Sequence, residues 1–313
     1  MTINHQLPTA LQASLRVGVV GLGMMGQHHA RVYSQLGYNL VGVVDADIER
    51  AKETGERYGV SYYTDYSKLI SQVDAVSIVV PTTLHRQIAT EFIRQGVHCL
   101  VEKPIASTLE EAQEMIRVAE ENHVKLAVGH IERFNPAVQK LKEIIDGGLL
   151  GKLMIISTRR VGPFVPRIRD VGIIIDTATH DIDVARYLAG SEPVNVFSKA
   201  GRFQHPKEDH AILVLDFGNT VASIEVNWFT PHKVRSLVAT GSEGIAYLDY
   251  IEQELTVHTS QSTQKFNIQK GEPLKLELKH FLSCIENDEK PLVDGTEGLK
   301  VLKLALEASK AAI

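Results

Sequence analysis

One glycine-rich hexapeptide constrains this chain more than any other part of its sequence. The apolar run Arg16–Val20 leads into Gly21, Gly23 and Gly26, spaced as G-x-G-x-x-G, and a segment with helical character follows. In this setting the first glycine permits a tight turn, the second lets a pyrophosphate approach the backbone, and the third lets helix and strand pack closely. The free N–H groups at the start of the helix can then bind phosphates. The pattern predicts the first turn of a doubly wound domain that binds a dinucleotide.

A carboxylate marks the end of the second apolar run. Asp45 lies 19 residues after Gly26 and directly follows the run Asn39–Val44. A carboxylate there can accept hydrogen bonds from both ribose hydroxyls of adenosine, and it repels a 2′-phosphate. The next residue, Ala46, offers no cation for such a phosphate. We therefore expect NAD rather than NADP, and we assign Met24 and Met25 of the glycine-rich loop to the same cofactor site.

The periodicity of the apolar residues divides the chain into two domains. Over residues 15–132, short continuous apolar runs alternate with helical segments, which indicates a Rossmann-type parallel sheet covered on both faces. Over residues 133–313, alternating runs with Gly218 and Asn219 between two of them indicate an α+β domain with a largely antiparallel open sheet. Helices are expected over residues 136–146 and 176–189. Residues 1–14 are read as an N-terminal extension, and the whole chain is of the α/β class.

The composition excludes several classes of partner. Among 313 residues, 33 lysines and arginines stand against 38 aspartates and glutamates, and this net charge of −5 argues against duplex nucleic acid. The two cysteines, Cys99 and Cys284, are too few for a disulfide framework and favour a reducing compartment. The first 14 residues lack the basic and apolar stretches of a signal peptide, and no apolar run has membrane-spanning length. We expect a cytoplasmic protein that binds neither nucleic acid nor membranes.

Two short motifs carry candidate catalytic side chains. Glu102, Lys103 and Pro104 end an apolar run, and ligands of parallel sheets bind beyond such strand ends. Lys103 can therefore hydrogen-bond a substrate hydroxyl, although a solvated lysine at a strand end is the alternative. Asp176 and His180 are four residues apart on a predicted helix, where a carboxylate can orient a histidine that accepts a proton. No second histidine or cysteine stands at ligand spacing, so no metal is expected.

Together these motifs resemble the glucose–fructose oxidoreductase/inositol dehydrogenase (Gfo/Idh/MocA) family. The resemblance extends from residue 15 to the C-terminus and rests on GLGMMGQHH, PTTLH, the Glu-Lys-Pro strand end and the D-x-x-x-H helix. It implies a Rossmann domain followed by a sheet domain that supplies the substrate site and the oligomer interface. For oxidation of a sugar or cyclitol alcohol, it implies that Lys103 holds the hydroxyl oxygen, His180 accepts the proton and Asp176 orients His180. The cofactor-side residues that the motifs add are Pro81, Thr82, His85, Glu102 and Lys103.

Two further segments point to the substrate. GHIERFNPAV (129–138) and RRVGPFVPRIRDVG (159–172) resemble the subgroup that oxidises the 3-hydroxyl of UDP-N-acetylglucosamine to a 3-keto sugar nucleotide. Arginine forks bind diphosphates well, which suits such a substrate. Surface or subunit ion pairs are the alternative for several of these arginines. The candidate substrate residues are Arg133, Phe134, Asn135, Arg159, Arg160, Arg167 and Arg169.

Two other functions stay open at this point. A dehydrogenase of a free sugar or inositol would need no arginines that bind a diphosphate. A protein that holds NAD for binding or regulation would not need the complete set of Lys103, Asp176 and His180, so the set favours an enzyme. An antiparallel sheet with one open face also predicts a homodimer or homotetramer formed through the C-terminal domain.

Overall fold

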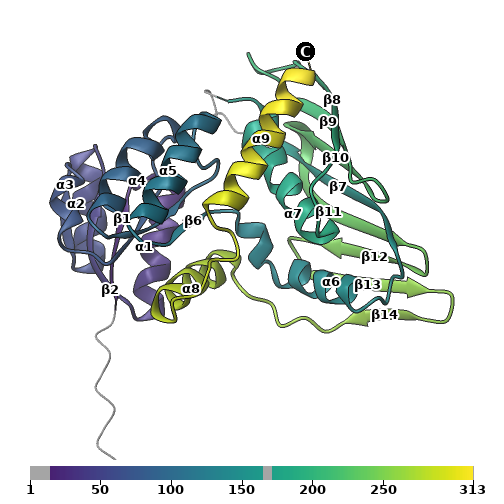
Figure 1. Ribbon diagram of the computed structural model, residues 1–313, viewed down its shortest axis with the longest axis horizontal. Coiled ribbons are helices and arrows are strands. Elements are labelled where there is room, and N and C mark those ends of the chain that lie inside the picture. Colours follow the sequence, from purple (N-terminus) through teal and green to yellow (C-terminus); the bar gives the residue numbers. More distant parts are fainter. Residues whose placement is uncertain (1–14, 165–170, 313) are drawn as a thin grey trace, which may run out of the picture.

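The computed structural model describes residues 15–164 and 171–312, and these residues form two sheets that lie side by side (Figure 1). The predicted extension 1–14 lies outside the described residues. The first sheet has six parallel strands in the order β3-β2-β1-β4-β5-β6, which confirms the predicted doubly wound fold. Its strands are β1 (Arg16–Val20), β2 (Asn39–Val44), β3 (Ser61–Tyr63), β4 (Ala75–Ile78), β5 (His98–Val101) and β6 (Leu126–Val128).

Helices cover both faces of the first sheet, so its central strands are buried on both sides and read as continuous apolar runs. These elements are α1 (Met24–Leu36), α2 (Ile48–Tyr58), α3 (Ser67–Ile70), α4 (His85–Arg94), α5 (Leu109–Glu121) and the 3-10 turns η1 (Thr82–Leu84) and η2 (Ile131–Phe134). A helix from far along the chain joins them. In α8 (Pro273–Glu286), Leu278 and Phe281 share a core with Val17 and Val19 of β1, and α8 lies under α1 (Figure 1).

The second sheet has eight strands in the order β14-β13-β12-β11-β7-β10-β9-β8. Only the neighbours β7 and β10 run parallel within it, which confirms a largely antiparallel sheet. The predicted turn at Gly218, whose φ is +81°, joins β9 to β10. The strands are β7 (Leu153–Pro163), β8 (Asn195–Gly201), β9 (His210–Asp216), β10 (Val221–Asn227), β11 (Phe229–Gly241), β12 (Gly244–Asp249), β13 (Glu254–Thr259) and β14 (Thr263–Phe266).

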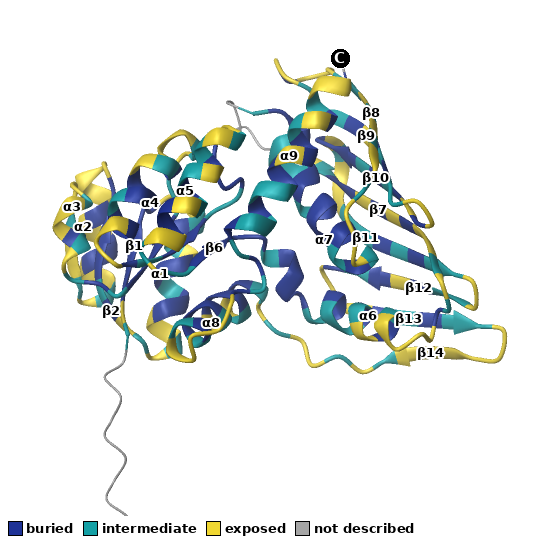
Figure 2. Ribbon diagram, viewed as in Figure 1, coloured by how far each residue is buried: buried dark blue, intermediate teal, exposed yellow. Residues whose placement is uncertain are grey.

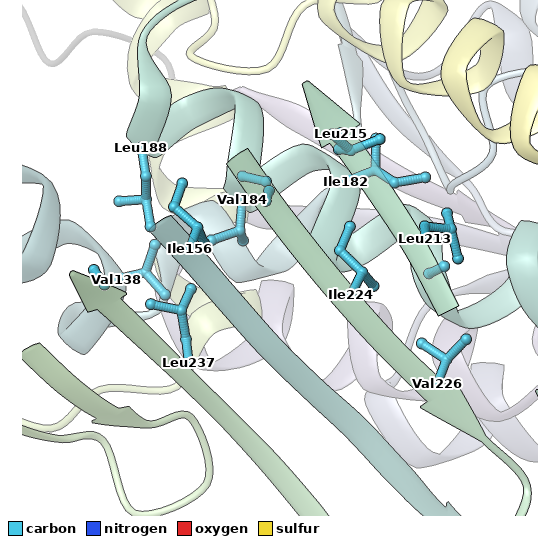
Figure 3. Packing of buried hydrophobic residues seen from close by; sticks show 14 of the residues in the cluster. Val138, Ile156, Ile182, Val184, Leu188, Leu213, Leu215, Ile224, Val226 and Leu237 are labelled. Carbon is cyan, nitrogen blue, oxygen red and sulfur yellow. The ribbon is translucent and has the colours of Figure 1, made fainter. Parts of the chain in front are cut away.

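One face of the second sheet is covered by helices and the other is open. Ile156 and Ile224 point from the strands towards Ile182 and Val184 on the covering helix α7, and Leu237 lies beside Val138 of a second covering helix (Figure 3). The side chains that alternate with these along each strand point to the open face. Those that are exposed appear as yellow segments of the strands in Figure 2. The covering elements are α6 (Pro136–Asp146), the π-helical turn η3 (Ile174–Ala178), α7 (Thr179–Ala189) and α9 (Gly295–Ala311). The exposed apolar side chains of the open face include Ile155, Phe197, Ile212, Val221 and Tyr247.

The helix predicted over residues 176–189 begins as a π-helical turn and continues as α7, and Gly190 ends it in the left-handed region. Such a turn inserts an extra residue into the helix and is frequent at functional sites. Among the helices of residues 15–164 and 171–312, none is both long and apolar enough to cross a membrane.

Buried ion pairs fix η2 and α9 against α7. The Arg133 guanidinium is 4% exposed and donates to the Asp183 carboxylate at 2.7 Å and to Glu297 at 2.7 Å. Arg186 donates to the same Glu297 at 3.2 Å. Although burial acts in the opposite direction, these arginines hold the pKa of Glu297 at about 2. The charges are therefore mutually compensated, and removal of one leaves another buried without a partner.

This arrangement predicts unequal stability losses from two arginine substitutions. Arg133→Met leaves Asp183 buried without its cation, which we expect to lower the free energy of unfolding by about 3–5 kcal/mol. The matched control is Arg117→Met, because Arg117 pairs with Glu121 on α5 with both side chains exposed. That change should lower it by no more than about 1 kcal/mol. Urea unfolding at pH 7 measures both, and equal losses would contradict the assignment.

Candidate active site

The glycine-rich loop follows β1 and opens α1. Gly21 has φ of +89°, and a Cβ there would lie 2.3 Å from the carbonyl oxygen of Val79. A Cβ on Gly26 would lie 1.8 Å from the carbonyl oxygen of Gly21, so helix and loop pack too closely for any side chain. Gly23 is exposed, and a Cβ there would meet no protein atom within 4 Å. Its backbone therefore stays open to a ligand in front of the helix.

A cavity of about 620 Å³ lies beyond the carboxyl ends of β1, β2 and β4. Gly21 and Gly23 line one part of it, Asp45 and Arg50 another, and Pro81 a third. The strand order of the sheet reverses between β1 and β4, and ligands of such sheets bind at this switch point. The volume, the exposed backbone of Gly23 and the carboxylate at one end suit the adenosine half of a dinucleotide. Met24 is exposed beside this loop, and Met25 is half-buried.

The Asp45 carboxylate is fixed by the surrounding backbone. It accepts hydrogen bonds from the N–H groups of Leu22 at 2.7 Å and Asp47 at 2.9 Å. The Arg50 guanidinium also lies 3.2 Å from both of its oxygens. The sequence pattern, in which Ala46 follows the carboxylate, does not predict this cation. Arg50 comes one helical turn into α2, and no motif marks it.

Lys103 follows β5 in a loop that neighbouring side chains hold in place, with a cis peptide bond to Pro104. The Glu102 carboxylate contacts His29 Nε2 at 3.2 Å and accepts the Lys103 N–H at 3.1 Å. A ring nitrogen of the buried His85 lies 3.0 Å from the Pro104 carbonyl oxygen. Glu102 and His85 were expected to be cofactor-side residues, and the structure places both in contacts that hold the Lys103 loop. The nearby Thr82 is half-buried in η1.

The Lys103 ammonium group reaches the π-helical turn of the second half. Its Nζ donates to the backbone carbonyl of Asp176 at 2.6 Å and lies 3.4 Å from the Asp176 carboxylate. The Thr177 hydroxyl donates to the same carboxylate at 3.1 Å, and it accepts a hydrogen bond from Trp228 at 3.2 Å. Within residues 15–164 and 171–312, no hydrogen bond joins Asp176 to His180, its predicted partner. The carboxylate therefore positions the lysine, and it is held by a threonine and a tryptophan whose roles no sequence motif indicates.

His180 lies one helical turn after Asp176, at the start of α7, and its Nδ1 is buried without a partner in the described part of the chain. Burial lowers the pKa of His180 well below its usual value, and the positive charges of Lys103, Arg160 and Arg235 lower it further. The imidazole is therefore neutral at pH 7. A neutral imidazole beside a lysine can accept a proton from a hydroxyl that the lysine holds. In the same part of the chain, no cluster of three His, Cys, Asp or Glu side chains could bind a metal.

Three of the candidate substrate arginines are engaged by carboxylates. Arg133 is buried between Asp183 and Glu297, as described above. Arg160 is also buried, and it donates to Asp181 at 2.7 Å and to Glu132 at 2.8 Å. Arg159 is exposed and pairs with Glu225 on the open face, on the opposite side of the sheet from α7. The surface ion pair raised as an alternative from the sequence describes Arg159, whereas the ion pairs of Arg133 and Arg160 are buried inside the fold, which the sequence did not predict. Arg167 and Arg169 lie outside the described residues.

The two other candidate substrate residues also have internal partners. Phe134 is buried and its ring stacks at a tilt on His280, with 5.3 Å between the centroids. The Asn135 side chain caps α6 by accepting the Ala137 N–H at 3.1 Å, and it donates to the Tyr250 carbonyl at 3.0 Å. Their side chains fix the junction between the two halves, and a role in substrate binding is not supported by these contacts.

The glycine loop predicts two separable defects. Gly26→Ala forces a methyl group against the Gly21 carbonyl, so we expect a loss of about 1–3 kcal/mol in the free energy of unfolding. Gly23→Ala meets no protein atom and should leave stability unchanged. It should instead weaken dinucleotide binding, by about tenfold if the added methyl group costs about 1.4 kcal/mol of binding free energy. Thermal unfolding and fluorescence titration with NADH measure the two effects. If Gly23→Ala binds NADH as the wild type does, the loop is not the phosphate site.

Comparisons with known proteins agree with this fold. Residues 15–130 match the model of an oxidoreductase family with an NAD-binding Rossmann fold, and residues 138–247 match the GFO/IDH/MocA C-terminal domain. The first range contains all six strands of the first sheet, and the second contains the strands of the second sheet from β7 to β11 and most of β12.

Curated relatives and solved structures match the chain over nearly its full length. UDP-N-acetylglucosamine 3-dehydrogenase of Acidithiobacillus ferrooxidans is 32% identical over 95% of this chain and 97% of its own. The solved structure of that enzyme, with the same identity and coverage, superposes with a TM-score of 0.90. The scyllo-inositol 2-dehydrogenase (NAD(+)) of Bacillus subtilis is 31% identical over 96% of this chain and 95% of its own. The chain therefore belongs to the GFO/IDH/MocA family of oxidoreductases.

Proposed function

We propose that this oxidoreductase is an NAD-dependent dehydrogenase that oxidises the 3-hydroxyl of UDP-N-acetylglucosamine to the 3-keto sugar nucleotide. The observation that carries the proposal is the position of Lys103 at the end of β5, in contact with Asp176 and beside the neutral His180. The relative from Acidithiobacillus ferrooxidans, 32% identical over 95% of this chain, supports the choice of substrate.

In this proposal each of three side chains has one task. Lys103 donates a hydrogen bond to the substrate hydroxyl and stabilises the negative charge that develops on its oxygen. His180 accepts the hydroxyl proton as a general base. Asp176 and the Thr177 hydroxyl hold the lysine in position. A nicotinamide bound beyond β1 and β4 would accept the hydride from the sugar carbon. Gly21, Gly23, Gly26 and Asp45 would hold that cofactor.

A second candidate function is the oxidation of a neutral cyclitol such as inositol. The observation that favours it is the engagement of Arg133, Arg159 and Arg160 by carboxylates, because a neutral substrate needs no free arginines. The scyllo-inositol dehydrogenase relative, at 31% identity, supports it as well. The two candidates share the same three catalytic side chains and differ only in the substrate.

The proposal includes a homodimer or homotetramer in which a second copy covers the open face of the second sheet. The exposed Ile155, Phe197, Ile212 and Tyr247 form part of an apolar surface of the kind that marks protein interfaces. The two cysteines are buried and unpaired, which fits the cytoplasmic location expected from the sequence.

A substrate panel with two active-site variants tests the function. We expect NADH to form with UDP-N-acetylglucosamine and not with inositol. His180→Ala and Lys103→Met should each lower kcat by about 10²–10⁴-fold, because a general base and an oxygen-holding cation are lost. Lys303→Met on α9, which removes an exposed charge, is the control and should keep full activity. NADH formation with inositol alone would select the second candidate, and losses below about tenfold would refute the catalytic roles.

The position of Arg50 leads to a prediction about cofactor choice. Asp45→Ser removes the carboxylate that repels a 2′-phosphate and frees Arg50 to bind one. We expect this single change to shift the ratio of kcat/KM values towards NADP by about tenfold or more, since tenfold needs only about 1.4 kcal/mol. Asp45→Ser with Arg50→Gln is the control, and the gain with NADP should disappear there. An unchanged ratio in the single variant would contradict the ribose role of Asp45.

A further inference from the structure

Arg235 is a cation beside the catalytic side chains that no motif marks. It lies on β11 directly opposite Arg160 of β7, and its backbone carbonyl accepts the Tyr250 N–H at 3.0 Å. Alternate residues of β11 from this position, Leu237 and Ala239, are buried under the helices. Arg235 therefore lies on the helix-covered face, the same side of the sheet as α7 and His180.

Arg160 and Arg235, which lie opposite each other on neighbouring strands, have very different surroundings. Arg160 has a side chain 4% exposed, and it is hydrogen-bonded to Asp181 and Glu132. The Arg235 side chain is 41% exposed, and among the described residues its ion pair is a 4.0 Å contact with Glu132 Oε1. That same oxygen already accepts a hydrogen bond from Arg160 at 2.8 Å. In residues 15–164 and 171–312, the Arg235 guanidinium donates no hydrogen bond, so its five N–H donors are available to a ligand.

Strand register places this guanidinium close to α7, because Arg160, directly opposite it, donates to Asp181, the residue that follows His180, at 2.7 Å. The charge of Arg235 is among those that lower the pKa of His180, and the Asp176 carboxylate acts on Arg235 in turn. Burial and the neighbouring Arg160 lower the pKa of Arg235, while Glu132 and Asp181 oppose them. The contact of Arg235 with Glu132 agrees, because Glu132 also binds Arg160 of the adjoining strand β7, on which α7 packs. A group bound to Arg235 would therefore be part of a molecule whose hydroxyl lies at Lys103 and His180.

Four other cations near this site, all within residues 15–164, already have partners or face the other way. Arg133 and Arg160 use their donors on buried carboxylates, Arg159 lies on the opposite face, and Lys103 is held by Asp176. A guanidinium with a free planar fork matches the oxygens of a phosphate or carboxylate, which it can bind with two parallel hydrogen bonds. The chemistry that fits Arg235 is thus an anionic oxygen pair carried by the substrate near the carbon that is oxidised.

We infer that Arg235 binds a phosphate of the substrate, the one attached to the sugar, and so orients the sugar ring over Lys103 and His180. This inference rests on the proposed function, because it takes a nucleotide sugar as the substrate. The inference assigns phosphate binding to Arg235 of β11, a role that the sequence analysis gave to Arg133 and Arg160 among others. Arg235 makes the site selective for anionic substrates over neutral ones.

Binding of UDP tests this role separately from catalysis. Isothermal titration of UDP into the NADH-loaded protein should give saturable binding that Arg235→Gln weakens at least tenfold and Arg235→Lys weakens less. The affinity for NADH and the thermal midpoint should not change, since the Arg235 side chain makes no hydrogen bond in the described fold. The control is Lys152→Gln, which removes one exposed positive charge before β7. Equal UDP affinity in wild type and Arg235→Gln, or no UDP binding at all, overturns the inference.

Two further measurements distinguish a failure of this inference from a failure of the proposed function. They are the kinetics with UDP-N-acetylglucosamine and the binding of glucuronate. With UDP-N-acetylglucosamine, Arg235→Gln should raise KM at least tenfold and change kcat much less, because the residue positions the substrate. If the wild type binds UDP through Arg235 and does not oxidise UDP-N-acetylglucosamine, the proposed function fails and the phosphate site stands. If the wild type oxidises it and Arg235→Gln has the same KM, the function stands and this inference fails. Glucuronate binding lost in Arg235→Gln, with UDP binding kept, would assign the site to a carboxylate and overturn the phosphate.

Discussion

The contact between Lys103 and Asp176 is the interaction on which the site depends, because it joins the two halves of the molecule at the reacting position. Lys103 leaves the end of β5 in a loop that His85 and the Glu102–His29 pair hold in place. Asp176 stands in a π-helical turn above the second sheet. A lysine tied to that turn has one defined place for its ammonium group, and in the proposed reaction this fixes the place of the substrate oxygen as well. The remaining groups of the site are arranged around this point.

Compensation of buried charge explains why so many arginines surround the site without facing a ligand. A guanidinium excluded from water is tolerated only where carboxylates meet its donors. Arg133 and Arg160 satisfy this rule through Asp181 and Asp183, which are two residues apart on α7 and bind different arginines. α7 therefore carries His180 and is joined by ion pairs to η2 through Arg133 and to β7 through Arg160. The position of His180, the proposed base, is fixed by these ion pairs, while its Nδ1 has no partner among residues 15–164 and 171–312.

Local patterns predicted the parts of this fold that depend on neighbouring residues. The spacing of Gly21, Gly23 and Gly26 and the helix containing His180 follow from steric limits within a few residues, and both are found. The partners of Arg133 could not be predicted, because Asp183 and Glu297 reach it only after the chain has folded. Arg50 and Arg235 were missed for the same reason. Their importance comes from strand register and helix packing, which single-sequence spacing does not encode.

Because α8 packs on the first sheet, the core of that sheet cannot form completely until α8 has been synthesised. Leu278 and Phe281 fill a core whose other side is formed by Val17 and Val19, at the opposite end of the chain. Proteins are synthesised from the N-terminus, so β1 and α1 leave the ribosome long before the helix that covers them. Until about residue 286 has emerged, the cofactor half has an exposed apolar surface. The nucleotide-binding half is thus the first to be synthesised and among the last to be finished.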